Sequence, residues 1–210
     1  GYTTPEGFLE GWCLLQSGER FLALESQSPV QDMSIALGVP EWMISDWCTQ
    51  IGESDCAKLI QSLSQRAPLQ IRSSPNQCTR AELQQSLRAE DLLTAPIPHT
   101  DYGLTLLQRC NLPASKAFKK GLLEIQDAAS QRFCEALQVS KGERVLDYCA
   151  GAGGKALFLA GLGAEVYIHE PRSKAKDEAL KRAKRCGVTL KDEAPKNMDL
   201  VLVDAPCSGT

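Results

Sequence analysis

The 210-residue sequence lacks three features that would assign it directly to a familiar class of protein. No apolar run approaches the roughly 20 residues that a helix needs to cross a bilayer, so no membrane association is expected. No segment reads as a secretory signal peptide. The net charge is −3, so the chain has no overall basic character, and any affinity for nucleic acid must come from local patches.

The nine cysteines also lack a recognisable spacing. Their number is odd and no two of them have C-x-x-C spacing, so neither a disulfide framework nor a zinc knuckle is expected, and no metal ligand is predicted. Free thiols indicate a reducing compartment, and we expect a cytoplasmic protein. What the sequence does contain is 43% hydrophobic and 23% charged residues, the proportions of an ordinary globular protein of one or two domains.

Hydrophobic patterns predict two domains, residues 1–116 and residues 117–210. In the first, a helix that starts at a proline carries Trp42 and Trp47, whose spacing favours core positions over contacts with RNA bases. Ser54 is expected to cap the next helix. A strand, helix, strand, strand order follows, which suggests a small α+β unit resembling half of an RNA-recognition fold. An accessory domain without a ligand is the alternative.

Three shorter signals accompany this domain. Thr79 and Glu82 have the spacing of a capping box, which predicts a helix from residue 80. Residues 111–120 resemble a linker with three basic side chains, Lys116, Lys119 and Lys120. Asp127 is expected to cap the helix that follows.

The last third of the sequence has the order of elements that begins a nucleotide-binding α/β sheet. Residues 145–149 predict a buried strand, residues 150–155 a glycine-rich turn, and the residues up to about 162 a helix. Residues 164–168 predict the next strand, which delivers Glu170 at its carboxyl end. Glycine lets the backbone approach a ligand, a helix N-terminus offers unpaired N–H groups, and the acid can accept both ribose hydroxyls.

Three ligands compete for this turn. A phosphate P-loop would need a glycine where the chain has Cys149, so that pattern fails. A dinucleotide turn is satisfied by Gly151, Gly153 and Ala156, so the turn alone does not exclude NAD. S-adenosylmethionine needs a similar turn, with the acid again holding the ribose but with no diphosphate. The choice between these two depends on a second motif.

That second motif is a Pro-Cys loop. Residues 198–203 predict a buried parallel strand, and Asp204, Pro206 and Cys207 follow at its carboxyl end, where open α/β sheets place their chemistry. A dehydrogenase has no use for this acid and thiol. A cytosine carbon-5 methyltransferase does, because a thiolate must add to carbon 6 before carbon 5 can accept a methyl group. Asp204 is predicted to hold the base through ring N3 and the exocyclic amine.

Each of these side chains also has a plainer interpretation. Cys207 could be a small buried hydrophobic residue, although its position in a loop favours a chemical role. Asp204 could cap the loop. Lys155, on the first helical turn, is either a solvated surface lysine or a donor to Asp204 or to the substrate.

With these motifs in this order, residues 38–210 resemble the RsmB/Sun-type (NSUN-like) family of RNA (cytosine-5) methyltransferases. The most specific segments are residues 121–131, 145–155 and 199–210. The resemblance implies an α/β fold, a class I S-adenosylmethionine methyltransferase sheet of the Rossmann-like type, incomplete here and preceded by a small α+β RNA-recognition-like domain. It also implies a cofactor site lined by Cys149, Ala150, Gly151, Ala152, Gly153, Gly154, Lys155, Glu170 and Asp204.

The resemblance further assigns the thiol chemistry. Cys207 would help release the product, while the attacking cysteine would lie in a Thr-Cys motif after a fifth strand. That motif is not among the 210 residues, so we expect the chain to be cut short after its DAPCSG motif and to be inactive alone. Cys207 is the only catalytic thiol present, so it could itself be the attacking cysteine, as in DNA cytosine methyltransferases. A contact between Asp192 and the adenine of the cofactor also stays open.

The predicted function is therefore S-adenosylmethionine-dependent methylation of cytosine carbon 5 in RNA, with Cys207, Asp204 and Lys155 as catalytic residues. Ribosomal RNA is the expected substrate and transfer RNA the alternative. The linker lysines and the charged helix over residues 172–185 are predicted to hold the RNA. A non-catalytic RNA-binding or ribosome-assembly module that retains the fold is a second hypothesis, and an NAD-dependent oxidoreductase is a third.

Overall fold

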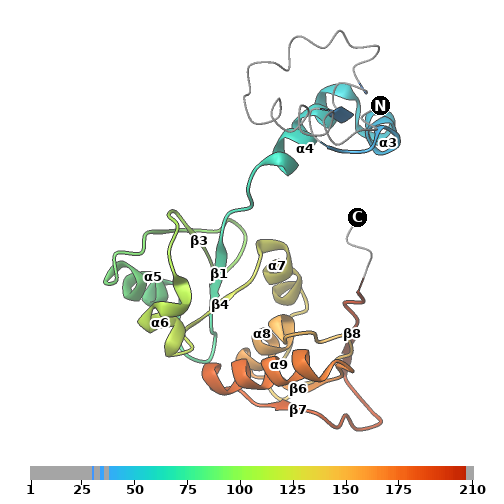
Figure 1. The fold of residues 1–210 in the computed structure, drawn as a ribbon. Helices are drawn as coiled ribbons and strands as arrows, with labels where there is room; N and C mark the ends of the chain where they lie inside the picture. Colours follow the sequence, from blue (N-terminus) through green and yellow to red (C-terminus); the bar gives the residue numbers. More distant parts are fainter. Residues whose placement is uncertain (1–29, 31–33, 36–37, 207–210) are drawn as a thin grey trace. The chain divides into compact units, whose positions relative to one another are not determined.

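The computed structural model describes residues 30, 34–35 and 38–206. The chain divides into two compact units between Ala67 and Pro68, and Figure 1 shows the elements of each. Among the described residues, no helix combines the length and the apolar character that crossing a membrane requires.

The first unit contains two consecutive helices, α3 (Glu41–Ile51) and α4 (Glu53–Ser64). Gly52 lies between them with a left-handed φ of 81°, which glycine adopts without strain. The predicted cap at Ser54 is wrong, because α4 begins two residues earlier than that cap requires and Gly52 occupies its cap position. Three buried side chains hold the two helices together: Ile44, Cys56 and Ile60.

The two tryptophans of α3 differ in their surroundings. Trp47 is half-buried and packs against the small core between α3 and α4. Trp42 is 67% exposed. The prediction of core positions is therefore confirmed for Trp47 and wrong for Trp42.

The second unit begins with an antiparallel sheet in the order β2-β3-β1-β4. Its strands are β1 (Gln70–Ser73), β2 (Thr94–Pro96), β3 (Gly103–Leu106) and β4 (Leu123–Ile125). The helix α5 (Arg80–Arg88) connects β1 to β2 and starts with the predicted capping box, in which Thr79 and Glu82 each bond the other's backbone N–H. Its buried leucines join the core of this sheet, made of Ile71, Leu83, Leu87, Leu104, Leu106, Leu112, Ala117 and Leu123.

The segment predicted as a linker belongs to this core instead. It forms the 3₁₀ turn η2 (Leu112–Ala114) and the short helix α6 (Lys116–Lys119), with Leu112 and Ala117 buried. The Ser115 hydroxyl caps α6 by accepting from the Phe118 N–H at 3.1 Å. The sequence pattern misleads here because the lysines lie on the outer side of a segment that packs inward. The domain boundary at residues 116/117 stays a prediction; β4, which follows it, pairs with β1.

The second sheet is parallel, with the strand order β7-β6-β5-β8. Its strands are β5 (Arg144–Asp147), β6 (Glu165–Ile168), β7 (Leu190–Lys191) and β8 (Leu200–Leu202). The helices are α7 (Ala128–Ala136), α8 (Gly154–Gly161) and α9 (Ser173–Cys186). The strand, turn, helix and strand predicted for residues 145–168 are confirmed as β5, α8 and β6, and Asp127 caps α7 as predicted by accepting from the Ser130 N–H at 2.9 Å.

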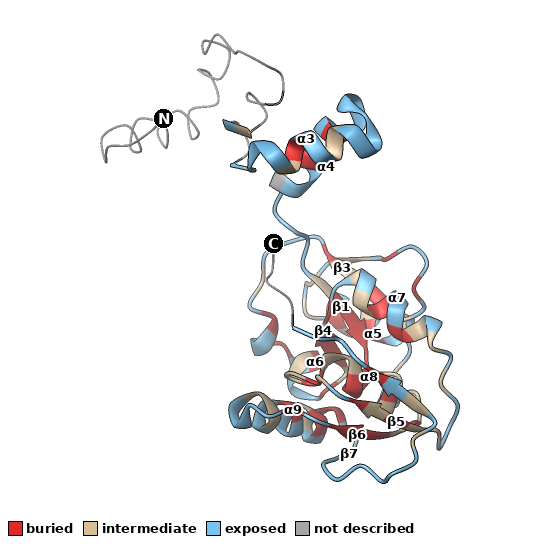
Figure 2. Ribbon diagram, turned by 90° about the vertical axis from the view of Figure 1, so that its right-hand side faces the viewer, coloured by how far each residue is buried: buried red, intermediate tan, exposed pale blue. Residues whose placement is uncertain are grey.

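One face of the parallel sheet is packed and carries the core. Figure 2 shows the buried residues concentrated on β5, β6, α8 and the inward side of α9. Phe158 of α8 lies at the centre of this layer and makes an edge contact with Tyr102, with ring centroids 5.1 Å apart. The strand predicted over residues 198–203 is present as β8, but the prediction that it is buried is wrong: β8 lies at the edge of the sheet, Val201 is 52% exposed, and Val203 just beyond it is 59% exposed. The carboxyl ends of β5 and β8 lie side by side, because these strands pair in parallel with Asp147 opposite Leu202.

Candidate functional site

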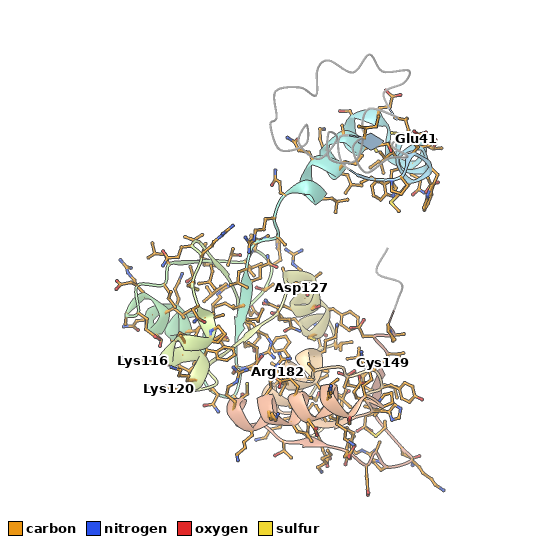
Figure 3. All side chains as sticks on the ribbon, in the orientation of Figure 1. Glu41, Lys116, Lys120, Asp127, Cys149 and Arg182 are labelled. Carbon is orange, nitrogen blue, oxygen red and sulfur yellow. The ribbon has the colours of Figure 1, made fainter. Side chains whose placement is uncertain are left out.

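A cavity of about 390 Å³ opens where β5 and β8 end. Its walls come from the segment between β4 and α7, the turn between β5 and α8, helix α9 and the residues after β8. Figure 3 labels Asp127, Cys149 and Arg182, which contribute to the wall from three of these segments. The full lining is Ile125, Gln126, Asp127, Ser130, Asp147, Cys149, Ala150, Gly151, Gly154, Lys155, Arg182 and Asp204.

The glycine turn takes a shape that side chains would disturb. Gly151 and Gly153 have φ values of 55° and 82°, in the left-handed region that favours glycine. A Cβ on Gly153 would lie 2.9 Å from the Cβ of Ala179, so this glycine also allows the turn to approach α9 closely. Gly154 has open space where a Cβ would stand and lines the cavity. The first turn of α8 therefore presents bare backbone to the cavity.

We predict that Gly153→Ala lowers the free energy of unfolding by about 1–2 kcal/mol, the cost of a left-handed residue with a side chain. The crowding against Ala179 adds to this cost. Gly154→Ala is the matched control and should leave stability nearly unchanged, because no atom of the described part of the chain outside its immediate neighbours lies within 4 Å of the added Cβ. Urea unfolding of both variants checks the difference, and equal stabilities would contradict this account of the turn.

Glu170 holds the turn from the end of β6. The residue is 7% exposed, and its carboxylate accepts from the Gly151 N–H at 2.8 Å. It also accepts from the backbone N–H of Arg172 at 2.9 Å and from the guanidinium of the same residue at 2.8 and 3.0 Å. The bonds from Arg172 and Gly151 lower the pKa of Glu170 to about 2. This acid is therefore ionised at neutral pH and fixes the turn, although its side chain does not line the cavity.

Lys155 and Asp204 form an ion pair across the cavity mouth. Lys155 belongs to the first turn of α8, and its side chain is 19% exposed. Asp204 follows β8, and its side chain is 58% exposed. The bond to Asp204 was one of the alternatives predicted for Lys155, and the structure contains it.

Asp147, the last residue of β5, is a site residue that the sequence analysis missed. It is 2% exposed, and among the described residues its Oδ1 has no hydrogen-bond partner. Burial raises the pKa of Asp147 to about 6, while the charge of Lys155 and the Ala156 N–H act in the opposite direction. A buried carboxylate oxygen without a partner is costly unless a ligand supplies the donor. The available signal was an aspartate that ends a buried strand directly before a glycine turn.

The other predicted site residues are placed as follows. Six of the predicted cofactor residues line the cavity: Cys149, Ala150, Gly151, Gly154, Lys155 and Asp204. Ala152, Gly153 and Glu170 do not line it; the carbonyl of Ala152 accepts from Arg182 at 2.8 Å. Asp192 pairs with Lys176 of α9. Cys207 lies outside the described residues.

Part of the charged helix α9 is committed to the protein itself. Arg182 and Arg185 both pair with Glu124 of β4, whose side chain is 2% exposed. Burial alone would raise the pKa of Glu124, but Arg182, Cys186 and Arg185 outweigh this effect and lower it. These two arginines join the parallel layer to the antiparallel sheet, which differs from their predicted role as RNA contacts. The sequence gives no sign of this, because Glu124 is 58 residues from Arg182.

The parallel sheet, the glycine turn after β5 and the acid after β6 are together the Rossmann-like fold of S-adenosylmethionine-dependent methyltransferases. A methyltransferase homologue protein from Pyrococcus horikoshii has this fold, with a TM-score of 0.75 at 24% identity over 87% of this chain and 64% of that one. Residues 39–113 match the ferredoxin-like domain of RsmF/B-like methyltransferases, and residues 134–210 match the 16S rRNA methyltransferase RsmB/F family. The chain belongs to the RsmB/F methyltransferase family.

Two curated relatives illustrate the extent of this similarity. Ribosomal RNA small subunit methyltransferase B of Photorhabdus laumondii is 29% identical over 188 residues, which cover 81% of this chain and 43% of that protein. The protein of the same name from Thermus thermophilus is 30% identical over 183 residues, which cover 84% of this chain and 40% of that protein. The chain thus spans less than half the length of the curated relatives it matches.

Proposed function

We propose that this chain is part of an enzyme that methylates carbon 5 of a cytosine in ribosomal RNA, with S-adenosylmethionine as the methyl donor. The observation that carries the proposal is the cavity at the ends of β5 and β8, which combines a buried acid, Asp147, with the Lys155–Asp204 pair. Membership of the RsmB/F family supports the reaction class and the RNA substrate. A cytoplasmic location is part of the proposal.

The residues of the cavity fit S-adenosylmethionine. A volume of about 390 Å³ is within the range of small-molecule sites. The unpartnered Oδ1 of Asp147 can accept from the ammonium of the methionine part, and the bare backbone of Gly151 and Gly154 allows close approach. Glu170 fixes the turn from the end of β6. When bound, S-adenosylmethionine supplies an electrophilic methyl group.

The reaction on the cytosine would combine residues of this chain with an attacking cysteine, which the family resemblance places in a Thr-Cys motif after a fifth strand. A cysteine thiolate adds to carbon 6 of the base, and the displaced electron pair moves to carbon 5, which then takes the methyl group. The proton on carbon 5 leaves to a base, the carbon 5–carbon 6 double bond forms again, and the thiolate is expelled. Asp204 would accept from the exocyclic amine of the cytosine, and Lys155 holds this carboxylate in place. Cys207, three residues after Asp204, is assigned to the thiol chemistry, with product release as the role that the family resemblance implies.

The Lys155–Asp204 pair provides a direct test in the full-length protein. We expect Asp204→Asn and Lys155→Met each to lower kcat about 100-fold, because each removes one half of the group that holds the base. The double variant should be little worse than either single variant, since both act through one contact. Asp55→Asn is the matched control, because it breaks another lysine–aspartate pair, with Lys58, that is exposed and does not line the cavity.

The measurement is transfer of a tritiated methyl group from S-adenosylmethionine to ribosomal RNA. Additive losses in the double variant would contradict a shared role for the pair. Label that reaches RNA but is found outside cytosine carbon 5 would contradict the proposed reaction while leaving methyl transfer intact.

A further inference from the structure

Arg72 of β1 is a buried cation at the junction of the two sheets. It is 1% exposed, and among the described residues no carboxylate forms an ion pair with it. Its guanidinium stacks on the ring of Phe158, with the central carbon 4.6 Å from the ring centroid. Burial lowers the pKa of Arg72 to about 10, partly offset by Glu124, so the side chain is charged at neutral pH. Burying a charge costs free energy unless hydrogen bonds compensate it, so the acceptors of Arg72 indicate which parts of the structure this residue holds in place.

Two of the three acceptors of Arg72 belong to residues that line the cavity. Its Nε donates to the Oε1 of Gln126 at 2.7 Å, and its Nη2 donates to the carbonyl of Gly154 at 3.3 Å. The third bond runs from Nη1 to the carbonyl of Ser73 at 3.2 Å. Gln126 precedes the cap of α7, and Gly154 begins α8. A residue of the antiparallel sheet therefore holds two segments of the cavity wall.

The contact with Arg72 fixes which end of the Gln126 amide faces the cavity. Arginine can only donate, so Gln126 must turn its oxygen toward Arg72 and its NH₂ group away from it. The backbone of Gln126 is also held, since its N–H donates to Gln70 at 3.2 Å and its carbonyl accepts from Gln131 at 2.7 Å. Among the described residues, the amide nitrogen of Gln126 has no acceptor, and the residue is 8% exposed. The result is a preoriented N–H donor in the wall of the cavity.

We infer that Gln126 donates to the carboxylate of the methionine part of the cofactor and that Arg72 is the positioning residue that aims it. The inference rests on the proposed function. Gln126 would supply the donor and Asp147 the acceptor that an amino acid zwitterion requires, and both line the same cavity. The antiparallel sheet then contributes to cofactor recognition through Arg72, although none of its first three strands lines the cavity.

The test compares two ligands on the full-length protein by calorimetry. S-adenosylmethionine has the amino and carboxylate groups, whereas 5′-methylthioadenosine keeps the nucleoside and sulfur but lacks them. Gln126→Glu preserves the shape of the side chain and can pair with Arg72, but it replaces the donor with a carboxylate. We expect this variant to bind S-adenosylmethionine 10- to 100-fold more weakly and methylthioadenosine within about twofold of the wild type.

Arg72→Met should produce the same selective loss, and combining it with Gln126→Glu should add little. Gln85→Glu on the exposed side of α5 is the control for added charge and should change neither affinity. Unchanged binding of S-adenosylmethionine by Gln126→Glu, or equal losses for both ligands, would overturn the inference alone. A wild-type protein that binds neither ligand would overturn the proposed function together with it.

Discussion

Replacing Cys207 with alanine in the full-length protein is expected to abolish turnover, by at least about 10³-fold, and to leave RNA covalently attached to the enzyme. The reason is the order of the thiol steps. If a second cysteine attacks carbon 6 and Cys207 helps to release the product, its loss stops the reaction after methyl transfer. A denaturing gel of the variant with labelled RNA and S-adenosylmethionine would then show a slowly migrating adduct.

The control is Cys110→Ala, because Cys110 is half-buried beside the core of the antiparallel sheet, away from the cavity. It should retain turnover and give no adduct. Loss of turnover by the Cys207 variant without an adduct would mean that Cys207 is the attacking thiol. Retained turnover would contradict any chemical role for Cys207.

Replacing Asp147 with asparagine is expected to stabilise the fold and to weaken cofactor binding. Burial raises the pKa of Asp147 from 3.8 to about 6, so keeping this carboxylate ionised in the folded state costs stability at neutral pH. A shift of about two units corresponds to at most about 3 kcal/mol, so we expect a gain of about 1–3 kcal/mol at pH 7. The same change removes the charged acceptor for the ammonium and should weaken S-adenosylmethionine binding 10- to 100-fold.

The stability difference between the wild type and Asp147→Asn should depend on pH. A raised pKa means that the folded state binds the proton more tightly, so the contribution of Asp147 to stability rises as the pH falls from about 6 toward 4. The advantage of the asparagine variant should therefore be full above pH 6 and disappear below pH 4. For the same reason, binding of a cationic ligand by the wild type should weaken below pH 6, where Asp147 is protonated.

Asp199→Asn is the control for removing one aspartate. Asp199 accepts hydrogen bonds from the side chain of Arg144 at 3.0 Å and from its backbone N–H at 2.9 Å. These bonds lower the pKa of Asp199, so the Asn variant should be less stable than the wild type at neutral pH. Urea unfolding at pH 7 and pH 4 and calorimetry with S-adenosylmethionine provide the measurements. If Asp147→Asn destabilised the fold at pH 7, or bound the ligand as tightly as the wild type, the role given to Asp147 would be wrong.

Local signals in the sequence predicted the elements whose causes are local. The glycine turn, the caps at Thr79 and Asp127 and the strand before Asp204 all depend on neighbouring residues, and the structure contains each of them. The Lys155–Asp204 contact was predictable because the glycine turn that leads to Lys155 follows β5, Asp204 follows β8, and these two strands pair in parallel.

The remaining features depend on contacts between distant residues. Arg72 and Gln126 are 54 residues apart, so no local pattern indicates that a strand of the first sheet orients a side chain in the cavity. Arg182 belongs to a helix whose charged sequence is typical of a solvated face, but its side chain pairs with Glu124 at the junction between the sheets. Asp147 was overlooked although its strand was predicted to be buried, because only the structure shows that its Oδ1 has no hydrogen-bond partner among the described residues.

The proposal that this fold methylates cytosine in ribosomal RNA can be tested directly by bisulfite sequencing. Ribosomal RNA from cells that lack the protein would be incubated with the full-length enzyme and S-adenosylmethionine, and then treated with bisulfite. We predict that a single cytosine becomes resistant to conversion, and that it does not do so with the Cys207→Ala variant. A preparation that transfers the methyl group to RNA while every cytosine stays convertible would contradict the account.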